Sequence, residues 1–206
     1  AAGGDVLFVG TKKQAQEVVA QEAQRCNMYY VNNRWLGGTL TNFATIQRSI
    51  RRLLELEEME SSGKLDALSK KEASRIRKQK IKLEKNLSGI KTMPRLPGVM
   101  FVIDTKKEAI AVREAERMHI PCIGIVDTNA DPDAVYLPVP GNDDAIRAVS
   151  LYCSIIANAA LEGQGLRQKY DRGAADTAET SDQEDVESEP VAVMADNDDD
   201  DSDYEE

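Results

Sequence analysis

Histidine and cysteine are scarce in this sequence, which leaves few side chains for catalysis or metal binding. The 206 residues include one histidine, His119, and three cysteines, Cys26, Cys122 and Cys153. The cysteines are odd in number and lie among apolar residues, which indicates neither a disulfide framework nor a metal site. With no second histidine, no serine elbow and no cysteine paired with a base, nucleophilic catalysis has no candidate residues. We therefore predict that the protein is not an enzyme and holds no metal.

Long apolar runs and phosphate-binding glycine motifs are also missing. No run approaches the roughly 18 residues of a membrane span, and no signal peptide opens the chain. No loop has the G-x-G-x-x-G or G-x-x-x-x-G-K-[ST] pattern that wraps backbone amides around phosphates. We therefore expect a protein of the cytoplasm, or of the equivalent compartment of an organelle. We expect no membrane partner, no cofactor and no small-molecule substrate.

The net charge of -10 hides a strong asymmetry between the body and the end of the chain. Residues 171–206 hold 16 of the 36 acidic residues and one of the 26 basic residues, which leaves 25 basic and 20 acidic residues before them. A segment this acidic with few large apolar side chains cannot recover its ordering entropy by burial. We predict a disordered acidic tail over 171–206. It serves either as a solubility tail or as a shield that keeps wrong polyanions from the basic body.

Apolar strands alternate with amphipathic helices in the rest of the chain. The segment FVIDTKKEA, within residues 99–127, repeats the pattern of LFVGTKKQA near the start of the chain. Each copy reads as a strand, a helix and a further strand, and Thr11/Gln14 and Thr105/Glu108 match capping boxes. The pattern predicts an α/β fold, a three-layer sandwich whose parallel sheet is covered on both faces, as in flavodoxin-like proteins. We assign this globular domain to residues 1–40 and 91–170.

A different period separates the two repeats, over residues 41–90. Apolar residues recur in steps of three and four along two segments joined by ESSGK, the second opening with a Ser69/Glu72 capping box. The recurring positions are Phe43, Ile46, Ile50 and Leu53, then Ala73, Ile76, Lys80, Leu83, Leu87 and Ile90. This spacing predicts an inserted antiparallel coiled-coil hairpin. Each helix has near 20 residues, so the arm extends on the order of 30 Å.

The arm and the strand-end loops carry the candidate nucleic-acid contacts. Residues 48–95 contain 14 basic and 7 acidic residues, whereas salt-bridged coiled-coil flanks would carry balanced charge. An excess of this sign in a projecting arm is typical of phosphate binding, although solvated helix faces remain the alternative. The predicted RNA-binding residues are Lys12, Lys13, Arg34, Trp35, Arg48, Arg51, Arg52, Lys70, Lys71, Arg75 and Lys78.

The stretch NNRWLGGTLTN, residues 32–42, contains the only tryptophan. Arg34 and Trp35 offer a planar cation and a stacking surface for unstacked bases. The alternative for Trp35 is a core position at the root of the arm. In that case Gly37 and Gly38 let the chain bend sharply from the sheet into the arm.

Two further functions stay open on the residues alone. The loops VGTKK, IDTKK and VDTN follow strands, at the edge where doubly wound folds bind ligands, so a flavodoxin-like nucleotide or small-molecule binder is one alternative. Threonine helix caps explain the TKK loops more simply. Asx turns likewise explain Asp127, Asp131 and Asp133 better than a cation site does. The other alternative is a coiled-coil interaction protein that binds no nucleic acid.

Five motifs together resemble one family, in order and without a gap from about Val6 to about Gly165. They are NNRWLGGTLTNFATIQRSIRRL, SGKLDALSKKEASR, LSGIKTMPRLPGVMFVID, IPCIGIVDTNADPD and VPGNDDAIRAVSLY. They resemble the bacterial form of the uS2 family of small-subunit ribosomal proteins. The family pattern also includes Asp104, Glu114 and the pair Ile120-Pro121.

The resemblance implies an α/β/α sandwich with a protruding coiled-coil arm and a structural, non-catalytic role in translation. It implies contacts with small-subunit rRNA and with neighbouring ribosomal proteins, including the large S-one protein. The opening segment of the family is missing here, so we expect an N-terminally incomplete chain. The acidic end is a second departure, and the resemblance implies no role for it.

Overall fold

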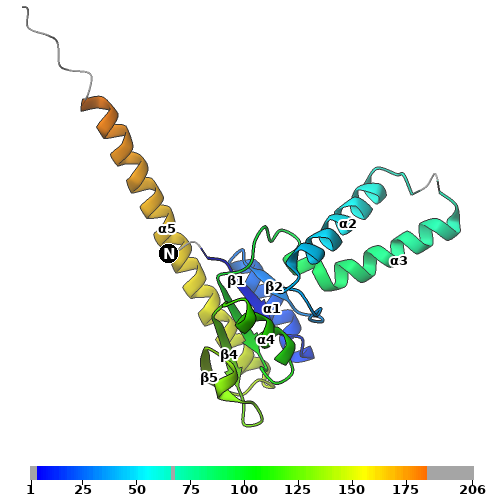
Figure 1. Cartoon of the computed structure of the whole chain (residues 1–206), viewed down its shortest axis with the longest axis horizontal. Coiled ribbons are helices and arrows are strands. Elements are labelled where there is room, and N and C mark those ends of the chain that lie inside the picture. Colours follow the sequence, from blue (N-terminus) through cyan, green and yellow to red (C-terminus); the bar gives the residue numbers. More distant parts are fainter. Residues whose placement is uncertain (1–3, 66–67, 185–206) are drawn as a thin grey trace, which may run out of the picture. The chain divides into compact units, whose positions relative to one another are not determined.

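A parallel sheet of five strands forms the centre of the first of two units, Ala1–Arg167 and Gln168–Glu206 (Figure 1). The structure is a computed structural model that describes residues 4–65 and 68–184, with side chains up to residue 169. The strands are β1 (Val6–Val9), β2 (Tyr29–Val31), β3 (Val99–Ile103), β4 (Cys122–Val126) and β5 (Leu137–Pro140). They lie in the order β2-β1-β3-β4-β5, and every neighbouring pair is parallel. This is the flavodoxin-like order, so the predicted α/β fold is confirmed.

Helices connect the strands and cover the sheet. They are α1 (Lys13–Arg25), α2 (Phe43–Ser61), α3 (Lys70–Leu87), α4 (Ala109–Arg117) and α5 (Ile146–Glu184). Two short 3-10 helices, η1 (Ser88–Ile90) and η2 (Pro132–Ala134), follow α3 and β4. No helix in the described part of the chain is long and apolar enough to cross a membrane.

Alternation along the central strands sends neighbouring side chains to opposite faces of the sheet. Leu7 and Met100 belong to one buried cluster, which also contains residues of α4 and the bases of α2 and α3. Phe8 and Phe101 belong to the other, against α1 and α5. Their rings meet edge to face with centroids 5.8 Å apart, and full burial of each contributes roughly 1.5–3 kcal/mol. Helical layers on both faces confirm the three-layer sandwich.

Helices α2 and α3 fill the connection between β2 and β3, where parallel strands need a crossover. They run antiparallel: Glu60 near the end of α2 pairs with Lys80 on α3 at 2.6 Å. Near the start of α2, the Nε2 of Gln47 donates to the carbonyl oxygen of Pro94 at 3.2 Å, beyond the end of α3. Figure 1 shows the two helices as the two limbs of one hairpin.

The recurring positions predicted to face each other across the hairpin, which we call the seam, are among its least exposed positions. On α2, Ile46, Ile50 and Leu53 are buried and Phe43 is half-buried. On α3 and η1, the buried or half-buried predicted positions are Ala73, Ile76, Lys80, Leu83, Leu87 and Ile90. The helical hairpin therefore has the expected inner face, while the knobs-into-holes packing of a coiled coil stays a prediction.

One of the three predicted capping boxes is present. Ser69 and Glu72 cap each other at the start of α3. The Thr11/Gln14 box is wrong, because α1 begins at Lys13 with no side-chain cap. The Thr105/Glu108 box is also wrong, since α4 begins only at Ala109 and Glu108 instead accepts hydrogen bonds from Thr11.

Helix α5 extends into the region predicted to be disordered. It runs to Glu184 and so includes residues 171–184 of the predicted tail, whose disorder stays a prediction. The alanines Ala174, Ala175 and Ala178 give this segment a helix propensity that charge counting overlooks. The rest of the predicted tail, residues 185–206, lies outside the described residues.

Candidate nucleic-acid interface

The eleven predicted RNA-binding residues fall into three places in the fold. Seven lie on the hairpin, with Arg48, Arg51 and Arg52 on α2 and Lys70, Lys71, Arg75 and Lys78 on α3. Arg34 and Trp35 follow β2, and Lys12 and Lys13 follow β1. Nine of the eleven are exposed, and the exceptions are Lys12 and Trp35. The structure therefore presents most of the candidates to solvent but divides them between hairpin and sheet edge.

Helix α3 carries a continuous row of cations on its outer face. Lys71, Arg75, Lys78, Lys82 and Lys85 follow one another in steps of four and three, and all are exposed. Arg75, Lys78, Lys82 and Lys85 each lie two residues after a seam position, and Lys71 continues the same spacing toward the start of the helix. Two residues correspond to a rotation of about 200°, so the row lies on the side of α3 away from the seam. We call these five residues the α3 basic row. From Lys71 to Lys85 the row covers about 21 Å of helix, at about 1.5 Å per residue.

Two members of this row, Lys82 and Lys85, are not among the predicted RNA-binding residues. The sequence spacing could have predicted them, because Lys82 and Lys85 each lie two residues after a seam position, as Arg75 and Lys78 do. Acidic residues are few on this helix: Lys70–Leu87 contains only Glu72 and Glu84. The α3 basic row is therefore an exposed strip of positive charge with little neutralisation from its own helix.

Helix α2 differs from α3, because two of its glutamates form ion pairs with lysines of the following segment. Glu57 pairs with Lys91, and Glu60 pairs with Lys80. Arg52 pairs with Glu55 at 2.9 Å, although both side chains are exposed. Surface pairs of this kind contribute little to stability. The acidic end of α2 thus neutralises inward lysines and leaves the α3 basic row uncovered.

Trp35 is a core residue, which favours the alternative of a core position over the predicted role in base stacking. Trp35 is 7% exposed, and it belongs to the buried cluster that also contains the bases of α2 and α3. Its Nε1 donates to the Oε1 of Glu114 on α4 at 3.1 Å. A ring that is buried and held by its N–H offers little surface to a nucleotide. The structure supports the alternative of a core position at the arm's root.

Glu114 organises the loop that follows Trp35. Its carboxylate accepts from the backbone N–H groups of Gly38 at 2.7 Å, Leu40 at 2.9 Å and Thr41 at 3.2 Å, and from the Thr41 hydroxyl at 3.2 Å. Gly38 has a φ of 89°, which favours glycine. A buried carboxylate is tolerated here because its oxygens meet several donors.

The same hydrogen bonds set the ionisation of Glu114. Burial by itself raises the pKa of this carboxyl, but the donors of Gly38, Leu40, Trp35 and Thr41 outweigh burial and hold the pKa below its usual value. Glu114 therefore stays negative at neutral pH. In the sequence, Glu114 stands out only as part of the family pattern, and nothing connects it with the loop. No local spacing could have made this connection, since 79 residues separate it from Trp35.

This loop joins the sheet to the hairpin, as predicted. It lies between β2 and α2, and the buried Leu40 packs in the same cluster as Val31 and Ile46. The Nδ2 of Asn33 donates to the carbonyl oxygen of Lys85 at 3.0 Å, which links the loop to α3. Arg34, between Asn33 and the buried Trp35, is exposed. The loop therefore fixes the root of the hairpin and leaves Arg34 available at the surface.

Lys12 is not a free surface cation, so its surroundings do not favour the predicted contact with RNA, which stays a prediction. Its Nζ lies 2.8 Å from Asp104, 2.8 Å from Asp143 and 2.9 Å from Asp144, and its side chain is 17% exposed. Burial alone lowers the pKa of Lys12, but the three aspartates outweigh burial and raise it. A lysine bound by three carboxylates is poorly placed to attract a phosphate. Lys13, the next residue, is exposed.

The strand-end loops bind one another across the sheet edge. Besides the Lys12 pairs, Thr11 after β1 donates to Glu108. Burial raises the pKa of Glu108 despite these hydrogen bonds. Asp104, with a φ of 64°, accepts from the backbone N–H of Lys107 at 2.9 Å. Most of the polar groups at this sheet edge are thus paired within the protein, but the buried Thr105 Oγ1 and Asp143 Oδ2 have no hydrogen-bond partner among the described residues.

Beside these loops is a surface groove of about 520 Å³. Its lining includes Lys106 and Arg113 together with Glu116, Asp131 and Asp133. Asp131 accepts from the backbone N–H of Asp133 at 3.0 Å, which confirms the predicted Asx turn. The mixed charges give the groove no net preference for an anionic ligand.

Comparisons with known proteins agree on one family. A family model described as "Ribosomal protein S2" matches residues 1–163. The chain is 60% identical over 160 residues to "Small ribosomal subunit protein uS2" of Treponema pallidum (strain Nichols), covering 78% of this chain and 55% of that protein. The protein of the same name from Endomicrobium trichonymphae is 54% identical over 169 residues, covering 82% of this chain and 69% of the relative. The chain thus spans about half the length of the Treponema relative.

Proposed function

Because this chain belongs to the ribosomal protein S2 family, we propose that it is a structural component of the small ribosomal subunit that binds small-subunit rRNA. The observation that supports RNA binding most directly is the α3 basic row. It is exposed, it spans about 21 Å, and only two acidic residues share its helix. Sugar-phosphate backbones are the natural partner of such a strip.

The proposed role involves no chemical reaction. Lysine and arginine on α3 hold RNA by attraction to phosphates and by release of counterions, so binding should weaken steeply with salt. Lys12, Asp104 and Glu108, which a catalytic site at the sheet edge would use, are paired with other residues of the chain. This pairing supports a non-enzymatic role over a flavodoxin-like nucleotide or small-molecule binder.

We further propose that neighbouring ribosomal proteins are partners, including the large S-one protein, and that the chain acts on ribosomes of the cytoplasm. Helix α5 supports protein contacts because Leu151 and Ile155, one turn apart, are both more than half exposed. Exposed apolar side chains gathered on one face are typical of protein interfaces. A protein partner on α5 and RNA on α3 would use different surfaces.

The test measures the affinity of the full chain for small-subunit rRNA by filter binding at several salt concentrations. The test variant combines Lys71→Glu, Arg75→Glu and Lys78→Glu. The control combines Lys106→Glu, Lys107→Glu and Arg117→Glu, which are exposed positions outside the hairpin and change the net charge equally. We expect the test variant to lose at least about tenfold in affinity and the salt slope to fall by about 2–3.

The two alternatives give different results in the same assay. Equal losses for test and control variants would mean that overall charge, not α3, drives binding. No measurable binding by the wild type at low salt would favour a hairpin that contacts only proteins.

A further inference from the structure

Two hollows beside α4 join into one groove. The hollow of about 520 Å³ described above and a second of about 410 Å³ share four lining residues, Val112, Glu116, Asp133 and Ala134. The first hollow extends to Thr105, which follows β3, and the second extends to Pro121, which precedes β4. The joined hollows therefore run along α4 from one edge of the sheet to the other, a distance of roughly 16 Å for a strand of five residues. We call them the α4 groove.

The groove exists because the connection from β4 to β5 is short. Residues 127–136 contain only the 3-10 helix η2, whereas β3 and β4 are joined by the longer helix α4. The helical layer on this face of the sheet therefore ends at α4 and leaves apolar side chains beside it. Val112 on α4 and Ala134 on η2 belong to the lining of both hollows.

The two sides of the groove carry opposite charges. Lys106, before α4, and Arg113, on α4, form what we call the basic rim. Asp131 and Asp133, at η2, form the acidic rim. All four side chains are exposed, and no ion pair within the described residues joins one rim to the other. A ligand that carries both signs of charge could pair with both rims at once.

Thr105 supplies an independent indication of a ligand. The residue lines the groove and is 4% exposed, and its Oγ1 has no hydrogen-bond partner among the described residues. Its methyl carbon packs over Gly124 of β4, where an added Cβ would lie only 2.4 Å away. The side chain therefore has little freedom to turn toward β4. A buried polar oxygen without a partner is rare in folded proteins and needs an explanation.

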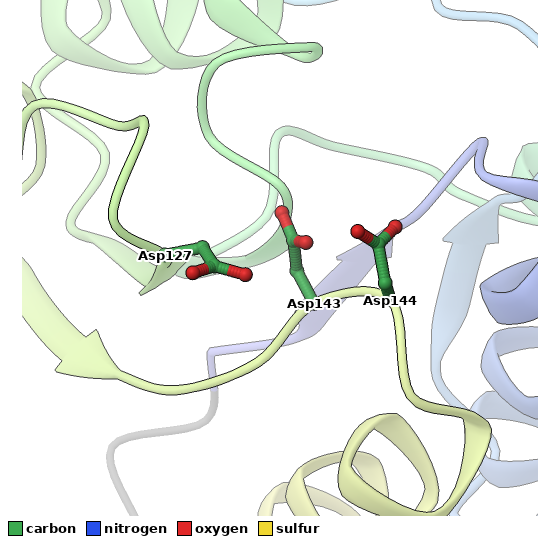
Figure 2. A group of neighbouring side chains, drawn as sticks. All are labelled: Asp127, Asp143 and Asp144. Carbon is green, nitrogen blue, oxygen red and sulfur yellow. The ribbon is translucent and has the colours of Figure 1, made fainter.

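The carboxylates near Lys12 are separate from this groove. Figure 2 shows Asp127, Asp143 and Asp144 beside one another, where β4 ends and before α5 begins. Asp143 and Asp144 pair with Lys12, and none of the three aspartates lines the α4 groove. The acidic rim is therefore not neutralised by Lys12.

Two other kinds of partner fit this surface poorly. RNA would be attracted by the basic rim but repelled by the acidic rim, which lies across the same groove. A partner strand could not pair fully with the neighbouring edge strand β5, because Pro138 and Pro140 have no backbone N–H to donate. A long, open groove with an apolar floor and polar rims is typical of peptide recognition.

We propose that the α4 groove binds a short peptide segment of a partner protein that carries an acidic group, an apolar side chain and a basic group. The acidic group pairs with the basic rim and accepts a hydrogen bond from the Thr105 hydroxyl. It lies near the start of α4, where the helix dipole also favours negative charge. The apolar side chain packs on Val112 and Ala134, and the basic group pairs with the acidic rim. This binding does not depend on RNA contacts by the α3 basic row.

The test titrates the ¹⁵N-labelled full chain with synthetic blocked pentapeptides and follows the backbone amides of Val112 and Ala134 by NMR. Two mixed peptides have leucine in the middle and glutamate and lysine at the ends, in either order. Two control peptides have glutamate at both ends or lysine at both ends. We expect one mixed peptide to bind at least about tenfold more tightly than either control, because only a mixed peptide pairs with both rims.

Charge reversal on the basic rim should remove this preference. Lys106→Glu combined with Arg113→Glu should weaken binding of the mixed peptide at least about tenfold and strengthen binding of the lysine peptide. Lys107→Glu combined with Arg117→Glu is the matched control, since both positions are exposed, lie outside the lining and change the net charge equally. The control variant should keep the wild-type affinity.

Thr105→Val separates ligand binding from a structural role. Valine has nearly the same shape but no hydroxyl, so we expect the mixed peptide to bind about tenfold more weakly. The Tm should not fall, because the hydroxyl has no partner within the described residues. A lower Tm with unchanged peptide affinity would contradict the assigned role of Thr105.

Three results would overturn the proposal as a whole. Equal losses for the two double variants would assign binding to net charge alone. Shifts of Val112 and Ala134 with an RNA oligonucleotide, but with no peptide, would assign the groove to nucleic acid. Failure of both mixed peptides to bind the wild type at millimolar concentration would leave the groove without the proposed ligand.

Discussion

Lys12 at the sheet edge and the lysines on α3 have opposite surroundings, although both belong to basic clusters in the sequence. Lys12 has three aspartates within 2.9 Å. Lys78 and Lys82 on α3 are exposed, on a helix with only two acidic residues. The first lysine is part of the fold, and the others are available to a partner. The comparison teaches that a basic residue indicates a polyanion site only after its acidic neighbours are known.

The two regions also differ in what removing a charge should do. At the sheet edge, loss of Lys12 leaves buried carboxylates unpaired, which is costly. On α3, a lost lysine leaves a solvated helix face almost unchanged. Stability should therefore report on the first region, and RNA affinity on the second.

Replacing Lys12 should give the largest effect on stability. Lys12→Ala leaves Asp143 and Asp104, both buried, without their cation. We expect a loss of about 3 kcal/mol in the free energy of unfolding, measured by urea denaturation. Lys78→Ala, the control on α3, should change it by no more than about 0.5 kcal/mol. Similar losses in the free energy of unfolding for both variants would contradict the proposed difference between the two regions.

Replacing Glu114 should give the next largest effect. Glu114→Gln puts an amide where three backbone N–H groups and the Trp35 Nε1 donate. We expect a loss of about 2 kcal/mol at neutral pH. Glu116→Gln, an exposed position on the same helix, is the control.

The effect of Glu114 should also depend on pH. Its folded pKa is below its ordinary value, so the ionised group stabilises the fold fully above the unfolded pKa, about 4.3. This contribution is lost as pH falls through the lower folded pKa. The difference between wild type and Glu114→Gln should therefore shrink in acid. A difference that stays constant down to pH 2 would contradict the assigned ionisation.

The smallest expected effect is the change in Trp35 fluorescence when RNA binds. Because the ring is 7% exposed, RNA should leave its fluorescence nearly unquenched, and acrylamide should quench it weakly. The chain has one tryptophan, so the signal has a single source. Strong quenching of the Trp35 fluorescence by saturating RNA would indicate that Trp35 contacts the RNA.

Sequence patterns predicted the features that depend on local periodicity. The strands around Phe8 and Phe101, the seam positions such as Ile50 and Leu87, and the Ser69 cap all follow from neighbours within about one or two helical turns. The fold class followed because apolar strands and amphipathic helices alternate.

The candidate site was predicted less well because its decisive contacts join distant residues. Lys12 and Asp143 are 131 residues apart, and Trp35 and Glu114 are 79 apart. Nothing in the spacing of TKK shows that three aspartates from other loops will surround its first lysine. The helix over residues 171–184 has two opposing signals in the sequence, because its net charge favours disorder and its alanines favour a helix.

The most direct measurement of the central claim is cleavage of small-subunit rRNA by iron tethered to the protein at single introduced cysteines. Gln79→Cys places the tether on α3, and Asn129→Cys places it beside the sheet-edge loops. The native cysteines are buried, and burial raises the pKa of Cys122 and Cys153 to about 12, so they should not react. We predict strong, localised cleavage from position 79 and little from position 129. Cleavage from position 129 with none from position 79 would contradict the account.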